Sequence, residues 1–226
     1  MNLTPQHLWI SMGGPAKAVF LVLILMLFAC VYVAIERVIL YTRARAQSRA
    51  LGEAVSGPLS QGNIEAALKV VKNEAYKLSY LGVIIRAGLE EYAKEPSEHG
   101  LRALKRAVEI KSPVEVANLR TGMNILATTG STAPFVGLVG TIFGIINAFA
   151  VMATAGGGDL TAISGGISEA LVSTAVGITV AIVAIWIYNA FNAILDDIQK
   201  DMLTAMQEID DWGEKDLHKR QQLAAK

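Results

Sequence analysis

Residues 18–35 read AVFLVLILMLFACVYVAI, which is 18 apolar residues in succession without a charged side chain. At 1.5 Å per residue, a helix of this length rises about 27 Å, close to the thickness of the hydrocarbon core of a bilayer. Two further uncharged stretches follow at residues 121–158 and 170–195. The sequence therefore predicts an all-α integral membrane protein with three transmembrane helices.

The composition of the 226 residues supports a membrane protein and excludes other classes. Of these residues 53% are hydrophobic and 18% are charged, whereas soluble domains average about 25% charged. Basic and acidic residues number 20 each, so the chain lacks the basic excess that binds nucleic acid. One cysteine and three scattered histidines form no metal-binding or catalytic pattern. We expect no enzyme activity, no cofactor, no metal ion and no nucleic-acid partner.

The positions of Lys and Arg predict the orientation, because cytoplasmic loops carry the basic excess. Residues 36–121 hold 14 of the 20 basic residues, the segment after residue 192 holds five, and residues 155–168 hold none. We therefore expect an N-terminus outside and a C-terminus inside. The three spans are assigned to residues 18–35, 122–154 and 169–191. The outer segments are residues 1–17 and 155–168, and the cytoplasmic segments are residues 36–121 and 192–226.

The cytoplasmic segments show helical periodicity. Apolar residues recur three or four positions apart over residues 64–71, 81–89 and 101–108, with breaks expected at Gly57-Pro58 and near Pro96. The third span should continue as an amphipathic helix through residue 209. These long extensions predict a helical cytoplasmic collar.

One local pattern predicts where the helix of the second span begins. Ser112-Pro113-Val114-Glu115 matches a capping box with proline at the first helical position. With no further helix breaker before Gly130, the helix is expected to run from there straight into the second span.

The two cytoplasmic segments differ in charge. Residues 36–121 are net basic by four, 14 against 10, and the tail carries a run of acidic residues, Asp196, Asp197, Asp201, Glu208, Asp210 and Asp211. Charge runs are usually solvated faces, and we favour that interpretation over a docking surface.

The second and third spans differ from the first in carrying small residues at helical spacing. Such residues let two membrane helices approach closely. The stripes comprise Gly137, Gly140, Gly144 and Ala148 in the second span, and Ala170, Thr174, Gly177, Ala181 and Ala184 in the third. We expect these two spans to line an interior and the first to face lipid. Tight packing alone would explain the stripes equally well.

Hydroxyl groups also lie within these spans. Thr141 is in the second span, and Ser173 and Thr174 are in the third, about one turn from Glu169. A carboxylate at the edge of a span is a candidate functional group, although Glu169 could be an ordinary interfacial residue and threonine often bonds back to its own helix. No ionisable residue lies at mid-depth in any span. If protons cross, another subunit must supply the carboxylate.

Two stretches carry a resemblance. Residues 132–145, TAPFVGLVGTIFGI, and residues 166–177, GISEALVSTAVG, resemble the MotA/TolQ/ExbB proton-channel family. The three-span topology and the length are similar to its ExbB and TolQ branch.

The resemblance implies a bacterial inner-membrane homopentamer, embedded in membrane lipid, whose second and third spans surround a pore. Two copies of a single-span protein similar to ExbD or TolR would supply a transmembrane aspartate there. Thr141 and Thr174 would line the proton path with Ser173, and Glu169 would lie beside the pore mouth. Proton flow would drive mechanical work on the cell envelope, with a TonB-like or TolA-like protein as a possible further partner.

The chain departs from the family pattern in three places. It has Gly165 and Val183 where many relatives have proline, and Phe143 replaces a frequent tryptophan. These differences leave the branch open, and a gliding-motility stator of the same family is one alternative. From other classes, a non-conducting scaffold remains open, and a secondary transporter is disfavoured because no inverted repeat is visible. The sequence determines neither the cargo nor whether the conducted ion is a proton or sodium.

Overall fold

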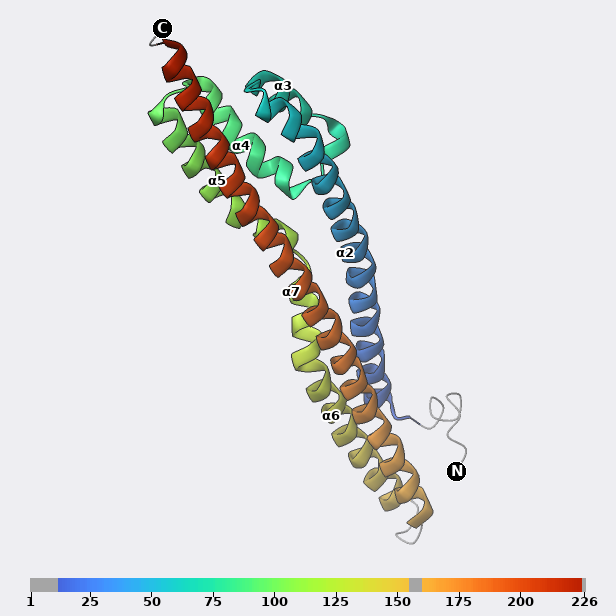
Figure 1. Cartoon of the computed structure of the whole chain (residues 1–226). Coiled ribbons are helices and arrows are strands. Elements are labelled where there is room, and N and C mark those ends of the chain that lie inside the picture. Colours follow the sequence, from blue (N-terminus) through green and yellow to red (C-terminus); the bar gives the residue numbers. More distant parts are fainter. Residues whose placement is uncertain (1–11, 155–159, 225–226) are drawn as a thin grey trace. The chain divides into compact units, whose positions relative to one another are not determined.

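The computed structural model describes residues 12–154 and 160–224, except for the side chains of residues 154, 160–164, 169, 223 and 224. Within this part of the chain the structure is helical and contains no strand, as predicted (Figure 1). The elements are α2 (Gly14–Ser60), α3 (Ile64–Val71), the short 3₁₀ helix η1 (Glu74–Tyr76), α4 (Tyr80–Lys94), α5 (Glu98–Leu119), α6 (Met123–Thr154) and α7 (Leu160–Ala224).

Three helices of the described residues are long and apolar enough to cross a membrane. They fall within Gly14–Ser60, Met123–Ala153 and Gly165–Gln222, which agrees with the number of spans predicted. α7 has 65 residues, whereas about 20 suffice to cross the hydrocarbon core. The third apolar stretch therefore continues as a long helix, as expected.

The described residues divide into two compact units. Unit 1 lies within Met1–Ile35 and Gly122–Ala190, and unit 2 lies within Glu36–Thr121 and Phe191–Lys226. In unit 1, Leu23 of α2 packs in a core with Ala133 of α6 and with Val180 and Ala181 of α7. A leucine from α2 thus covers small residues of the other two helices. The core of unit 2 contains fully or almost fully buried side chains from α2, α4, α5 and α7, including Leu51, Ile84, Leu89, Leu104 and Ile198.

The expectation of one helix running from Ser112 into the second span is wrong. α5 begins at Glu98 after the N-cap Ser97 and continues through Pro113 to Leu119. The chain then breaks before α6, and Gly122 has a φ of 81°, a left-handed conformation that favours glycine. The carbonyl oxygen of Leu119 accepts hydrogen bonds from Arg37 Nη1 at 3.3 Å and Tyr41 Oη at 2.8 Å. These α2 side chains bind a carbonyl that the helix end leaves without a helical partner.

The loop helices otherwise follow the predicted periodicity. α3, α4 and α5 bury the apolar positions expected, including Ile64, Ile84, Leu89 and Leu104. The break near Pro96 is confirmed, because α4 ends at Lys94 and α5 begins at Glu98. The break at Gly57-Pro58 is misplaced: α2 continues to Ser60, and the chain turns at Gly62, whose φ is 73°.

The tail of α7 packs against the loop helices inside unit 2, so its acidic residues are not simply a solvated face. Arg120 pairs with Asp196 at 3.8 Å, Arg45 with Asp197 at 3.3 Å and Lys105 with Asp210 at 2.8 Å. Tyr80 and Tyr92 donate hydrogen bonds to Asp201 and Asp216 at 2.7 and 3.0 Å. Basic residues of the loop and acidic residues of the tail therefore pair with each other within one chain.

Candidate functional site: the contact between α6 and α7

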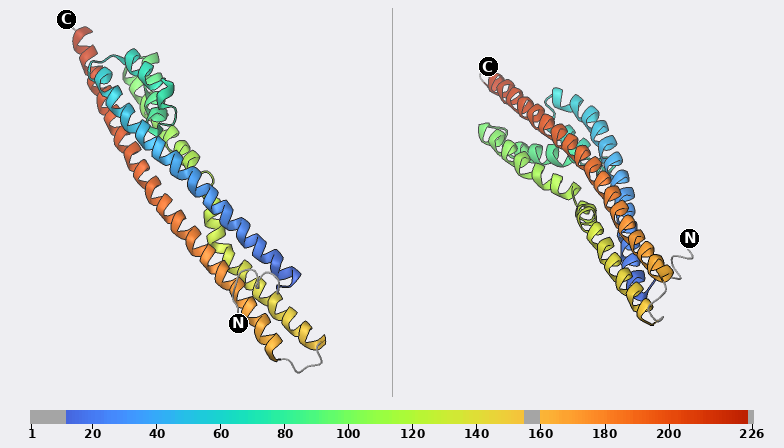
Figure 2. Two further views of the ribbon diagram at one scale, coloured as in Figure 1. Left: turned by 90° about the vertical axis from the view of Figure 1, so that its right-hand side faces the viewer. Right: turned by 90° about the horizontal axis from the view of Figure 1, so that it is seen from below.

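α6 and α7 run side by side in unit 1, and glycine permits their backbones to touch (Figures 1 and 2). A methyl group on Gly137 would lie 2.8 Å from the Ser173 carbonyl oxygen and 3.1 Å from Thr174 Cα. A methyl group on Gly177 would lie 2.6 Å from the Ala133 carbonyl oxygen. Both distances are shorter than van der Waals contact, so any larger residue would force the two helices apart.

The same close approach continues along the pair. A methyl group on Gly140 would lie 2.9 Å from Ser173 Cβ, and one on Gly144 would lie 2.6 Å from Ala170 Cβ. Ala148 and Ala181 are each 3% exposed. The structure therefore brings the small residues of the two spans together as the stripes predicted.

Two threonine hydroxyls meet inside this contact. Thr141 Oγ1 and Thr174 Oγ1 are hydrogen-bonded to each other. The Thr141 hydroxyl also lies 3.1 Å from the Ala170 carbonyl oxygen, and the Thr174 hydroxyl lies 3.3 Å from the Gly137 carbonyl oxygen. Because each hydroxyl has one proton to donate, one threonine can donate to the other while the second donates to a carbonyl. Both side chains are half-buried, so the pair is partly accessible from outside the chain.

Ser173 occupies a different environment from the two threonines. Its side chain is fully buried, and its Oγ has no hydrogen-bond partner among the described residues. It lies against Gly140, at the point where Val19 of α2 also reaches α6. Glu169 belongs to α7, but its side chain lies outside the described residues.

The chemistry available at this contact is that of neutral hydroxyls. Hydroxyls and exposed carbonyl oxygens can orient a proton donor or acceptor, but they do not hold a charge at ordinary pH. The sequence has no Asp, Glu, Lys, Arg or His at residues 121–158 or at residues 170–195. In the described part of the chain, no cluster of His, Cys, Asp and Glu could hold a metal ion. These two stretches therefore contribute no titrating group of their own to the contact.

Comparison with known families gives a direct match. The model of the MotA/TolQ/ExbB proton channel family matches residues 77–204, more than half of the chain. This chain belongs to that family. The match begins just before α4 and extends through α5 and α6 into the part of α7 that belongs to unit 2, so it contains both Thr141 and Thr174.

Individual relatives carry names from two branches of the family. A Tol-Pal system protein TolQ from Pseudomonas aeruginosa is 38% identical over 116 residues, covering 49% of this chain and 50% of the relative. A biopolymer transport protein ExbB from Xanthomonas campestris is 38% identical over 116 residues, covering 51% and 44%. An ExbB from Neisseria gonorrhoeae is 48% identical over 71 residues, covering 31% and 32%. The aligned regions span half or less of these relatives.

Sequence reasoning missed two groups that contribute to the contact between α6 and α7. The structure also shows the helix at two positions where the chain departs from the family pattern. Val19 of α2 and the Ala133 carbonyl oxygen complete the packing around Gly140 and Gly177, and neither carries a distinctive local signal. α7 is one helix across Gly165 and Val183, so these positions without proline show no helix break.

Proposed function

We propose that the chain is the proton-channel stator subunit of an inner-membrane motor of the ExbB/TolQ type. Such a motor converts proton-motive force into mechanical work on the cell envelope. The hydrogen-bonded Thr141–Thr174 pair between α6 and α7 is the observation that carries this proposal. A scaffold needs close helix packing, but it has no use for two hydroxyls joined inside the contact. The names of the relatives suggest two processes, Tol-Pal function and biopolymer transport, and we propose that the second would be TonB-dependent transport.

The missing charge supports a partner subunit, and the family resemblance supports the rest of the proposed assembly. Because the spans carry no mid-depth carboxylate, a single-span partner similar to ExbD or TolR would provide an aspartate beside the threonines. We propose a homopentamer with the second and third spans around a pore, and two partner copies inside it. The N-terminus and the second-to-third connection would be periplasmic, and unit 2 would be cytoplasmic. A TonB-like or TolA-like protein would receive the work.

Within this pore the residues have distinct roles. Thr141 and Thr174 would accept or donate hydrogen bonds to the partner carboxyl as it gains and loses a proton. Glu169 would lie beside the pore mouth, and Ser173 would extend the hydroxyl path. Gly137, Gly140, Gly144 and Gly177 would keep the two helices close enough for both threonines to reach one group.

Thr174→Val tests the proposal, with Thr174→Ser as its matched control. Valine has nearly the same volume as threonine but lacks the hydroxyl, whereas serine retains the hydroxyl. We expect at least a tenfold loss of proton flux for valine and near-normal flux for serine. Flux is measured with a pH-sensitive dye inside liposomes that contain the complex purified with its partner from the native host.

Two results would contradict the proposal. Equal flux in Thr174→Val and the parent would remove the hydroxyl pair from the proton path. No flux in the parent complex, at intact assembly and with the partner bound, would favour a non-conducting scaffold instead.

A further inference from the structure

α5 has an apolar face that unit 2 does not cover. Leu101, Leu104 and Val108 are buried at 9% exposure or less and pack inside the unit. On the other side of the helix, apolar residues recur at alternating intervals of four and three, the spacing of a coiled-coil seam. Ile110 and Val114 on that side are 58% and 50% exposed. This set, the α5 stripe, comprises the exposed Ile110, Val114 and Ala117 and the half-buried Ala103 and Ala107.

α2 presents a second exposed face in unit 2. Its buried residues are Ala44, Ser48, Leu51 and Val55, and residues opposite them recur three or four positions apart and are all exposed. This set, the α2 stripe, comprises Thr42, Ala46, Ala50, Glu53 and Gly57. Its members are mostly small, so a bulky side chain of another helix could pack between them.

The two stripes belong to different sides of unit 2. Figure 1 and the right-hand view of Figure 2 both show α5 and the upper part of α2 on opposite sides, with α4 between them. The stripes therefore cannot meet within one chain. Two different faces of one protein can meet between copies in a head-to-tail contact, and such contacts form a ring when the rotation from copy to copy closes.

The hydrogen bonds at Leu119 fix the relative level of the stripes. Arg37 and Tyr41 both reach the Leu119 carbonyl oxygen, so the end of α5 is level with residues 37–41. From that level α2 runs toward higher residue numbers and α5 toward lower ones. Counting one residue for one along both helices places Val114 level with residues 42–46 and Ile110 level with residues 46–50. Arg106 is then level with residues 50–54, which include Glu53.

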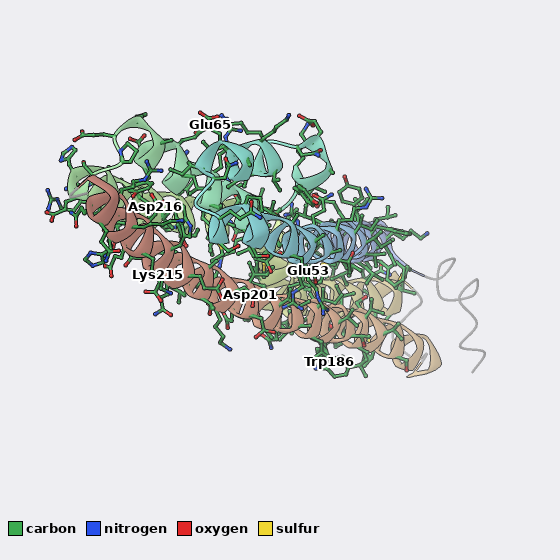
Figure 3. The ribbon with its side chains drawn as sticks, turned by 45° about the horizontal axis from the view of Figure 1, so that its top comes forward. Glu53, Glu65, Trp186, Asp201, Lys215 and Asp216 are labelled. Carbon is green, nitrogen blue, oxygen red and sulfur yellow. The ribbon has the colours of Figure 1, made fainter. Side chains whose placement is uncertain are left out.

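These levels make the stripes complementary. The two bulky side chains of the α5 stripe fall opposite Ala46 and Ala50, which are small, and a basic residue falls opposite an acidic one. The Glu53 side chain is 77% exposed, and its contact with Arg49 is long at 3.8 Å (Figure 3). It is therefore available to a cation on another chain. In a ring whose axis runs parallel to these helices, all copies lie at the same height along the axis. Residues at one level in one copy would therefore meet residues at that level in the next copy.

We propose that the α5 stripe of one copy packs on the α2 stripe of the next copy around the ring. Ile110 and Val114 cover Ala46 and Ala50, and Arg106 faces Glu53. This contact rests on the proposed function, because it requires the cyclic homo-oligomer. This contact would bury apolar side chains of α5 that unit 2 leaves exposed.

Cysteine cross-linking in native membranes tests the contact. The sole cysteine, buried Cys30, is first replaced by serine, and Ala46→Cys and Val114→Cys are then combined. A short bis-maleimide should produce a ladder of covalent oligomers up to five chains on a denaturing gel. Each single variant is the matched control and should give no ladder, because a head-to-tail contact never brings one residue against its own copy. Cross-linked dimers from Val114→Cys alone would overturn the proposal in favour of paired α5 helices.

Charge reversal supplies an independent test. Glu53→Arg should weaken the ladder several-fold, and adding Arg106→Glu should restore it. Native mass spectrometry of the unmodified complex separates the two proposals. Five copies without any ladder in the double-cysteine variant would overturn this contact and leave the proposed function standing. A monomer without partner would overturn both.

Discussion

Tyr92 illustrates at the residue scale how burial alters a side chain in unit 2. It is fully buried, donates a hydrogen bond to Asp216 Oδ2 at 3.0 Å and meets Trp212 edge-on at 5.7 Å between ring centroids. Burial first, and then the hydrogen bond and charge of Asp216, raise the pKa of Tyr92 to about 12. The unfolded chain would ionise this group near pH 10.

The raised pKa of Tyr92 predicts a loss of stability at high pH. Because the folded protein keeps its proton longer than the unfolded chain, the stabilisation is complete below pH 10 and is lost as the pH rises through about 12. We expect the free energy of unfolding to fall by on the order of 2 kcal/mol across this window. Tyr92→Phe should make that dependence shallower, measured by denaturant unfolding in detergent with tryptophan fluorescence. An unchanged slope in this variant would contradict the assignment.

Residue-level features were predictable from the sequence only where a rare residue type stood in an apolar span. Thr141 and Thr174 are polar residues among apolar ones, so their importance was visible before their hydrogen bond was known. Asp216 is one of many acids in a polar tail. Its burial at 7% exposure depends on α4, a long-range contact that no local pattern encodes.

At the scale of elements, the α6–α7 contact distinguishes two glycines of the same helix. A methyl group on Gly177 would meet the Ala133 carbonyl oxygen at 2.6 Å, whereas one on Gly165 would meet nothing within 4 Å. Gly177→Ala should destabilise the protein by roughly 1–3 kcal/mol through overpacking. Gly165→Ala is the control and should be neutral or slightly stabilising, because alanine favours a helix. Thermal unfolding in detergent measures both, and equal midpoints would show that the close contact is absent.

The elements themselves were predictable where periodicity was strong, and the exception has a physical cause. Ser112-Pro113 satisfies the local rules for a helix start, yet α5 is already formed there and ends later, at Leu119. The end is stabilised by Arg37 and Tyr41, which lie 82 and 78 residues away in the sequence. A break that depends on side chains from another helix cannot be deduced from the residues around it.

At the scale of the whole molecule, the three spans were predictable because the bilayer sets a required length of apolar helix. The division into two units was not, since α2 and α7 each pass from one unit to the other as an unbroken helix. A hydropathy pattern shows only where an apolar stretch ends, whereas the boundaries of the two units depend on which side chains pack together.

The orientation of the whole molecule leads to the last prediction. With 14 basic residues in residues 36–121, the positive-inside rule predicts that unit 2 lies in the cytoplasm. In the Cys30→Ser background, Gly14→Cys should react with a membrane-impermeant maleimide in spheroplasts, because this position is exposed and no described residue lies within 4 Å of a methyl group placed there. Glu65→Cys, at an exposed position of α3 in unit 2 (Figure 3), should react only after lysis. Labelling of Glu65→Cys in sealed spheroplasts would reverse the orientation and, with it, the side from which protons enter the proposed pore.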